Sequence, residues 1–420
     1  MISVDISNIW CSVSLPELLQ SEKAMLEAHT KLSGERRQNS WLSWLDGSDD
    51  ARRTWVNPVI AAAEKIRANS EILVVVGGGL SAAAAQAAIR LLPARAANLR
   101  LLFLGQDYST EKWLRAVQTL EHAEFSVLVA APTGDETAPL ITLRALRWIM
   151  EKRYGSAAKD RIYISAGNPH SALMELGEAL GCNILPMPDS PGAATSALNS
   201  ASLLIMAAAG ISPGLVYTGA AEAAAAYDDR SFDNPVWLYA ASRFVLKNSG
   251  LGSELLCTPD PASESFGSWW LRTMAAAGNK DGCGVFLSHA KLPDDFFIMG
   301  DALLQPSHFA TLLRLPLTNK KATVEVDWKD LDGLNCLAGQ DLTFVEGKML
   351  DAVAAAMTEQ EVPFLTIECD EEPTDDRAGE LFCFLEMAAG LSAQVMGVSP
   401  AVRRHVPAVL EALDRELGRK

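Results

Sequence analysis

The strongest constraint on the fold of this chain is the alternation of apolar runs and amphipathic segments that begins at residue 72. Mainly apolar, strand-like runs occupy residues 72–76, 101–104, 125–130, 161–165 and 183–187, and segments with helical spacing separate them. Strands that are apolar along their whole length are buried on both faces, and intervening helices make such strands parallel. Because these crossovers are right-handed, the pattern predicts a doubly wound α/β sandwich.

A second α/β region follows residues 197–209, an apolar helix that we interpret as a bridge. Extended segments are expected at 253–257, 285–288, 308–315, 322–326 and 364–368, with helices between most of them. The predicted organisation is an N-terminal helical segment (1–66), a first α/β domain (67–196), a second α/β domain (197–400) and a C-terminal helix (401–420).

Composition excludes several classes of partner. The chain has 420 residues and a formal net charge of −16 at pH 7, so no basic stripe is available for nucleic acid or an anionic membrane. Seven scattered cysteines without a C-x-x-C pair predict reduced thiols and a cytoplasmic protein. The N-terminus lacks the basic start of a signal peptide, and the longest apolar runs are too short to span a bilayer. No Cys/His cluster or cofactor motif is present, so we expect neither a metal nor a cofactor.

Residues 131–139 (APTGDETAP) have the arrangement of a phosphate-binding turn. They join an apolar strand to a helix, where backbone N–H groups and the helix dipole favour an anion. Thr133, Gly134 and Thr137 suit that role. Asp135 and Glu136 oppose it, because two like charges about 4 Å apart cost roughly 4 kcal/mol at a surface-like dielectric. The turn therefore looks like a phosphate site whose chemistry disfavours a phosphate, unless a carboxylate is protonated or faces away.

A glycine turn follows the first strand, with Gly77, Gly78 and Gly79 preceding Ser81. Glycines allow positive φ and close approach of a ligand to the backbone. The turn is not a P-loop. It is not a dinucleotide fingerprint either, because Ala82 occupies the third glycine position. A tight strand-to-helix turn without a ligand remains an alternative to a binding turn.

Several motifs in a specific order resemble the bacterial type of phosphoglucose isomerase (glucose-6-phosphate isomerase) over nearly the whole length. They are WLSWLD (41–46), NP and YAASR (234–243), WW (269–270), KDG (280–282), GLNCLA (333–338) and GVSP (397–400). The resemblance implies two sugar-isomerase (SIS) α/β sandwiches with parallel sheets, helical extensions at both ends, a cleft between the sandwiches and a homodimer that completes each site. It also implies an aldose–ketose isomerisation of a sugar 6-phosphate, in which a carboxylate moves a proton and cations support the enediolate.

The residues at the family's catalytic positions do not fit this chemistry. The base falls on Ala276, the arginine on Ala194, the ring-opening histidine on Phe297 and the C-terminal lysine on Leu410. A methyl group cannot accept a proton, and no guanidinium remains for the enediolate. We therefore expect no catalytic residues. A remnant ligand cleft would be formed by Gly77, Gly79, Ser81, Thr133, Gly134, Asp135, Glu136 and Thr137.

The expected protein is thus a family member that has lost isomerase activity and binds another small carbohydrate-like ligand, or acts as a regulatory or structural homologue. One alternative is an active glucose-6-phosphate isomerase of glycolysis and gluconeogenesis with relocated groups, and another is an interaction protein with an empty cleft. Replacement groups are sought among His170, His289, His405, Asp260, Glu264, Lys280, Arg403 and Arg404. Each has a plainer interpretation as a helix start, a turn or a solvated helix end.

Overall fold

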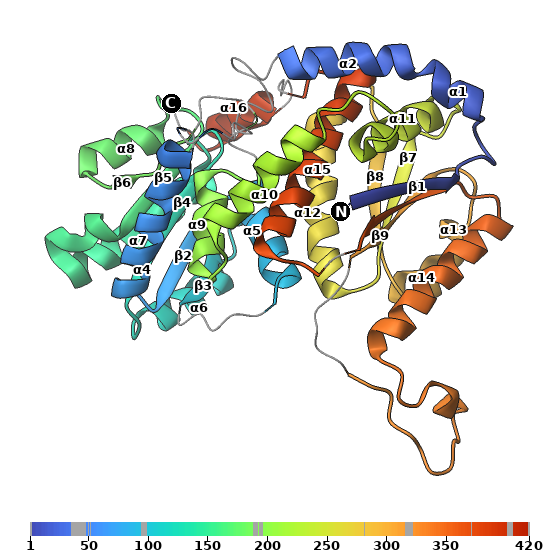
Figure 1. Cartoon of the computed structure of the whole chain (residues 1–420). Coiled ribbons are helices and arrows are strands. Elements are labelled where there is room, and N and C mark those ends of the chain that lie inside the picture. The colour runs from blue at the N-terminus through green and yellow to red at the C-terminus, as the bar shows by residue number, and fades with distance from the viewer. Residues whose placement is uncertain are drawn as a thin grey trace.

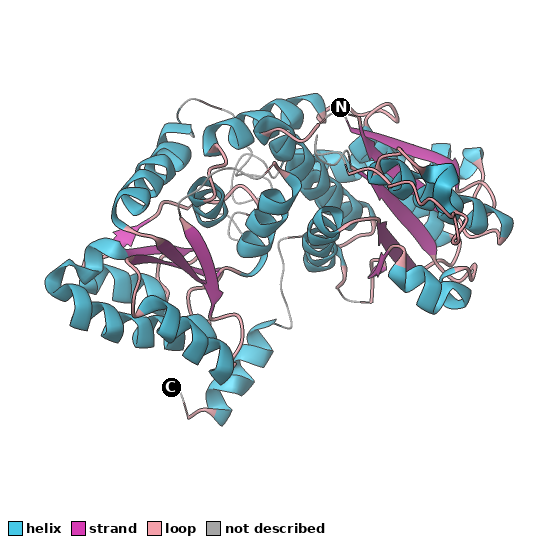
Figure 2. Cartoon of the chain, turned by 90° about the horizontal axis from the view of Figure 1, so that it is seen from below, coloured by secondary structure: helices cyan, strands magenta, loops and turns pink. Residues whose placement is uncertain are grey.

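The computed structural model (Figure 1) describes residues 2–34, 48, 50, 52–93, 99–187, 192, 196–280, 282–315, 322–370, 372–400 and 406–418. Its main feature is a pair of five-stranded sheets. Seen from below, the two groups of strands lie on opposite sides of a set of helices (Figure 2).

The first sheet is entirely parallel. Its order is β3 (Arg100–Leu104), β2 (Ile72–Gly77), β4 (Phe125–Ala131), β5 (Ile162–Ala166) and β6 (Asn183–Ile184). The connecting helices are α5 (Gly79–Leu91), α6 (Thr110–Leu120), α7 (Thr137–Tyr154) and α8 (Ala172–Leu180), and α4 (Asn57–Asn69) precedes β2. Leu73 and Val75 belong to the inner core, which includes side chains from both sheets. Val74 and Val76 belong to an outer core on the other face of the first sheet. The predicted doubly wound arrangement of this half is confirmed.

The second sheet is mixed. Its order is β1 (Ile2–Asn8), β10 (Phe364–Cys369), β9 (Phe309–Arg314), β7 (Ser253–Thr258) and β8 (Phe286–Lys291), and only β1 is antiparallel to its neighbour. Its helices are α11 (Pro235–Asn248), α12 (Pro261–Gly278), α13 (Asp294–Leu303), α14 (Leu342–Glu359) and α15 (Asp375–Val395). The second α/β unit expected from the sequence is therefore present, but its sheet is mixed and not parallel as the resemblance implies, because β1 from the N-terminal segment adds to β10 in the antiparallel direction.

Strand β1 corrects the expectation of a purely helical N-terminal segment. Apolar Ile2, Val4 and Ile6 alternate with polar residues, and the apolar side chains pack against the inner core. This period of two is the pattern of a strand with one buried face. The rest of the segment contains α1 (Leu15–Gln20), α2 (Glu22–Gly34), a π-helical turn (Arg52–Val56) and α4. Its proposed boundary at residue 66 stays a prediction.

A shared layer of helices lies between the sheets. It includes α9 (Ser200–Ala208), α10 (Pro213–Ala226), α5, α12 and α15, and one continuous core joins side chains from both sheets. Helices α10 and α15 cross at glycines. A Cβ on Gly219 would overlap the carbonyl of Asp376, and one on Gly379 would overlap the carbonyl of Val216. Both positions therefore require glycine for this close approach.

The YAASR motif has a structural role in this core. Glu254 on β7 is buried and accepts hydrogen bonds from the Tyr239 hydroxyl (2.6 Å), the Arg243 Nε (2.7 Å) and the Thr311 hydroxyl (2.7 Å). A buried charge is tolerated when it is paired and hydrogen-bonded in this way. The motif thus joins α11 to the centre of the second sheet.

Residues 322–341 form an arm that projects from the body before α14 (Figure 1). The arm contains a short 3-10 helix (Leu334–Leu337) and an isolated bridge between Thr323 and Asp341. The extended segment expected at 322–326 is thus reduced to one bridge. The chain ends in α16 (Val406–Glu416). Within the described ranges, no helix has the length and apolar character needed to cross a bilayer.

Candidate functional site

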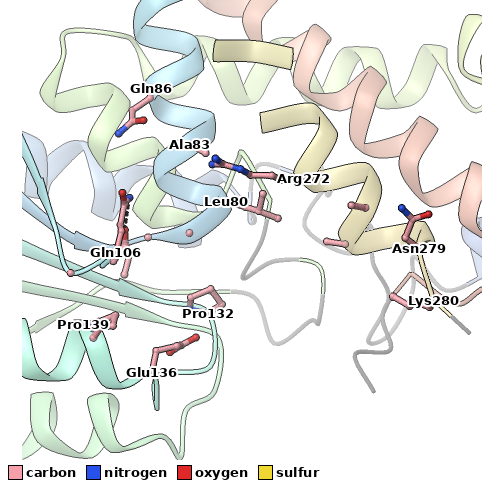
Figure 3. A pocket seen from close by; sticks show the side chains of 18 residues that line it. Leu80, Ala83, Gln86, Gln106, Pro132, Glu136, Pro139, Arg272, Asn279 and Lys280 are labelled. Carbon is pink, nitrogen blue, oxygen red and sulfur yellow. Dashed lines mark hydrogen bonds between the residues drawn. The ribbon is translucent and has the colours of Figure 1, made fainter. Parts of the chain in front are cut away.

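A cavity of about 830 Å³ opens where the start of α5, the turn before α7 and the end of α12 meet (Figure 3). One wall comes from the first sheet and the other from α12. The described lining residues are Gly77, Gly78, Gly79, Leu80, Ala83, Gln86, Gly105, Gln106, Ala130, Pro132, Glu136, Ala138, Pro139, Arg272, Ala275, Ala276, Asn279 and Lys280. The volume lies in the range of small-molecule sites.

The glycine turn shapes the first wall. Gly77, Gly78 and Gly79 have φ angles of 75°, 87° and 47°, which side chains rarely adopt. A Cβ on Gly77 would also collide with the Ala130 carbonyl, the group to which Gly78 N–H donates at 2.6 Å. Because these three residues have no side chains, the turn lines the cavity with backbone atoms. The Gln106 amide donates to the Gly77 carbonyl at 3.0 Å and lines the cavity beside it.

Glu136 occupies the donors of the turn before α7. Its two carboxylate oxygens accept hydrogen bonds from Thr133 N–H (2.8 Å) and Gly134 N–H (2.9 Å). These backbone donors have the placement that favours an anion at a strand–turn–helix junction. The anion found there is the chain's own carboxylate.

Asp135 belongs to a different contact. Its carboxylate accepts from Ala172 N–H (2.9 Å) at the first turn of α8, where a negative charge is stabilising. Gly134 has a φ of 84°, and a Cβ there would overlap the Ser171 side chain. The turn is therefore packed closely on the start of α8. The two carboxylates that oppose a phosphate in the sequence thus each accept backbone hydrogen bonds.

The structure brings only part of the expected remnant cleft to the cavity. Gly77, Gly79 and Glu136 line it. Ser81 is buried, and its hydroxyl accepts from the Asn199 amide (2.7 Å) at the start of α9. The described lining does not include Thr133, Gly134, Asp135 or Thr137, which belong to the turn behind Glu136 and to the buried start of α7.

Helix α12 supplies the opposite wall. Asp260 caps its start by accepting from Ala262 N–H (2.7 Å), and Trp269 and Trp270 bury one face in the core. Arg272 and Ala276 are four residues apart, so they share the face toward the cavity. Ala276, the residue that the resemblance places at the catalytic base, therefore lines the cavity.

Two cationic side chains line this wall. Figure 3 shows Arg272 extending from α12 toward Leu80 and Ala83 of α5. Within the described residues, Arg272 has no hydrogen-bond or ion-pair partner. The Lys280 ammonium donates to the carbonyls of Ser399 (3.0 Å) and Pro400 (2.9 Å). Arg272 is not among the site residues expected from the sequence, although its spacing of four from position 276 is a usable signal.

The other family positions lie elsewhere. Phe297 is on α13 with a side chain 78% exposed, and Leu410 is half-buried on α16. Neither is among the lining residues of the cavity. Ala194 lies outside the described residues, as do the WLSWLD motif and the basic residues at 403–405.

The remaining candidates have structural partners. His289 Nε2 lies 2.8 Å from the Thr258 hydroxyl, and burial lowers the pKa of this histidine. Glu264 forms an ion pair with Lys291 at 2.6 Å. His170 is exposed in the turn before α8. Among the described residues, no group of three or more His, Cys, Asp or Glu side chains has a metal-binding arrangement, and the seven cysteines are free thiols.

The fold and the cleft define a sugar-isomerase type of α/β protein, and comparisons with known proteins agree. No family model matches the chain. It is 32% identical over 400 residues to a glucose-6-phosphate isomerase of Exiguobacterium sibiricum, covering 92% of this chain and 89% of that one. A glucose-6-phosphate isomerase of Clostridium perfringens is 30% identical, with 99% and 95% covered. The chain therefore belongs to the glucose-6-phosphate isomerase family.

Solved structures show the same fold. A hypothetical protein of Thermus thermophilus superposes with a TM-score of 0.84 at 17% identity, covering 99% of both chains. A glucose-6-phosphate isomerase of Chlamydia trachomatis gives a TM-score of 0.77 at 12% identity, with 99% of this chain and 88% of that chain covered. The expected SIS-type architecture is confirmed.

Proposed function

We propose that this family member binds a sugar-type ligand in the cavity between the first sheet and α12, without catalysing aldose–ketose isomerisation. The observation that supports this proposal is Ala276, which lines the cavity where the resemblance expects the carboxylate base. Transfer of a proton between C1 and C2 needs a basic group within hydrogen-bond reach of the substrate, and a methyl group offers none.

The rest of the described cavity lining supports the same proposal. Glu136 is its one carboxylate, and both of its oxygens already accept backbone hydrogen bonds. The described lining contains no histidine. The arginine expected to support an enediolate is replaced at position 194, which lies outside the described residues. Loss of activity is thus inferred from residue types.

A second candidate is a working glucose-6-phosphate isomerase. The comparisons favour this candidate over loss of activity, because the relatives at about 30% identity are named glucose-6-phosphate isomerase. The cavity also holds a carboxylate and a guanidinium from other positions, Glu136 and Arg272. In this candidate Glu136 leaves its backbone donors and acts as the base, while Arg272 stabilises the enediolate.

A homodimer is part of the proposal, and the arm is the surface that supports it. Val326, Trp328 and Leu331 on this arm are 71%, 85% and 84% exposed. Large apolar side chains gathered at a surface are typical of protein–protein contacts. An interaction protein with an empty cleft would use the same arm. The seven free thiols fit a reducing compartment, and we propose a cytoplasmic location on that basis.

A coupled assay tests the proposal. Purified full-length protein is incubated with fructose 6-phosphate, and glucose 6-phosphate is detected with a dehydrogenase, using the Exiguobacterium relative as a positive control. We expect no turnover above background. Turnover that disappears in Glu136→Gln would support the second candidate and overturn the first. Ala276→Glu is the matched gain-of-function variant, because it returns a carboxylate to the cavity wall.

A further inference from the structure

The charged side chains on the two walls of the cavity, Glu136 and Arg272, differ in whether they have hydrogen-bond partners within the protein. Glu136 on the first wall is held by two backbone N–H groups at 2.8 and 2.9 Å. Arg272 on the opposite wall has no partner within the described residues and extends into the cavity (Figure 3). The donors of the turn are thus occupied, whereas no described side chain or backbone group occupies the guanidinium.

We propose that Glu136 is a specificity-determining internal anion that excludes phosphate from the turn, and that Arg272 binds the carboxylate of a sugar acid. This inference rests on the proposed function, since it names the ligand class of the same cavity. Thr133 N–H and Gly134 N–H cannot serve a phosphate while they hold the Glu136 carboxylate. A phosphorylated sugar would have to displace a charge that is covalently part of the turn.

A carboxylate and a phosphate differ in charge, and this difference affects how strongly Glu136 repels each of them. Repulsion from Glu136 scales with the charge on the ligand, so a phosphate dianion is opposed about twice as strongly as a carboxylate. The planar guanidinium of Arg272 can bind a carboxylate or a phosphate in a bidentate geometry, so the preference for a carboxylate comes from Glu136. Lys280 adds positive charge on the same wall, although its ammonium already donates to two carbonyls.

Amide side chains that line the cavity can form hydrogen bonds with the hydroxyl groups of the ligand. Gln86 and Gln106 line the wall of the first sheet, and Asn279 lines the wall of α12. Amide side chains donate to and accept from hydroxyl groups, so they suit a polyol. The cavity of about 830 Å³ has room for a hexose-sized molecule. A six-carbon sugar acid therefore fits the size and polarity of the site.

Calorimetric titration of the full-length protein at pH 7 tests this inference with D-glucuronate, D-glucose and glucose 6-phosphate. We expect glucuronate to bind at least tenfold more tightly than either other sugar. Arg272→Gln should lose at least tenfold in glucuronate affinity. Glu136→Ala, which frees both backbone donors, should gain at least tenfold for glucose 6-phosphate and for inorganic phosphate.

Control variants keep the test decisive. Glu151→Ala removes an exposed carboxylate elsewhere on α7 and should leave phosphate affinity unchanged. Glu136→Gln serves if the alanine variant fails to fold, because it keeps one acceptor in the turn. The inference is overturned if the wild type binds glucose 6-phosphate as tightly as glucuronate, if no sugar acid binds, or if neither Glu136 variant gains phosphate affinity. Binding of glucose 6-phosphate as tight as that of glucuronate, without turnover, would overturn this inference alone, whereas turnover would overturn the proposed function.

Discussion

Glu386 on α15 provides a stability prediction whose size follows from its surroundings. Glu386 is 2% exposed, and its carboxyl group accepts hydrogen bonds from Ala197 N–H (2.6 Å) and the Ser196 hydroxyl (3.0 Å). Burial raises the pKa of Glu386 from 4.5 to about 8, although both hydrogen bonds act in the opposite direction. The group therefore stays protonated in the folded protein at pH values where it is ionised in the unfolded chain.

The sign of the pH effect follows from proton linkage. Between pH 4.5 and 8 the unfolded state binds fewer protons than the native state at Glu386, so the free energy of unfolding falls as pH rises, by roughly 1.4 kcal/mol per pH unit. From pH 5 to pH 8 the group should cost on the order of 4 kcal/mol. Glu386→Gln removes this loss, because its amide is neutral throughout and can make similar hydrogen bonds.

The measurement is urea unfolding of wild type and Glu386→Gln at pH 5, 6.5 and 8, followed by tryptophan fluorescence and circular dichroism. We expect the variant to gain stability relative to wild type as pH rises. The control is Glu359→Gln, a substitution of an exposed glutamate at the end of α14. Its stability relative to wild type should not change with pH. A stability difference that is constant across the three pH values would refute the reasoning.

Three further predictions concern the core and the arm. Arg243→Met removes the partner of buried Glu254 and should cost about 3–5 kcal/mol in urea unfolding. Gly219→Ala places a methyl group against the Asp376 carbonyl, so α10 and α15 must separate, at about 1–3 kcal/mol in the same assay. Trp328→Ser on the exposed arm should shift the proposed homodimer to monomer in sedimentation velocity while leaving its thermal unfolding unchanged.

Matched controls distinguish these effects from general damage. Arg115→Met breaks an exposed ion pair with Glu111 and should cost less than about 1 kcal/mol. Gly252→Ala meets no atom within 4 Å, so its free energy of unfolding should stay close to that of wild type. Equal losses for a test variant and its control would contradict the assigned contact. A Trp328→Ser protein that remains fully dimeric would contradict the role of the arm.

The sequence predicted most of the fold because its central strands are unambiguous. β2 has no polar side chain and β4 has only Ser126, and such runs between helices have few alternative interpretations. Strand β1 was missed although Ile2, Val4 and Ile6 alternate with polar residues, and its pairing with β10, far along the chain, leaves no local signal. Helix α10 was also missed, since its alanine-rich sequence carries little periodicity.

The site was predicted less completely, for a physical reason. The turn before α7 and position 276 drew attention in the sequence because each lies in a local motif, and Glu136 and Ala276 both line the cavity. The orientation of Glu136 depends on backbone groups two and three residues away, which the sequence pattern leaves open. The contribution of Arg272 depends on how α12 packs against α5, a contact between residues almost two hundred positions apart that local periodicity does not report.

The central claim is that no group in the cleft moves a proton between C1 and C2 of a sugar phosphate. Proton NMR of fructose 6-phosphate and glucose 6-phosphate incubated with the full-length protein in D₂O measures that step directly. The account predicts no deuterium incorporation beyond the protein-free sample, for wild type and for Glu136→Gln alike. Incorporation of deuterium at C1 or C2 by the wild type, abolished in Glu136→Gln, would contradict it.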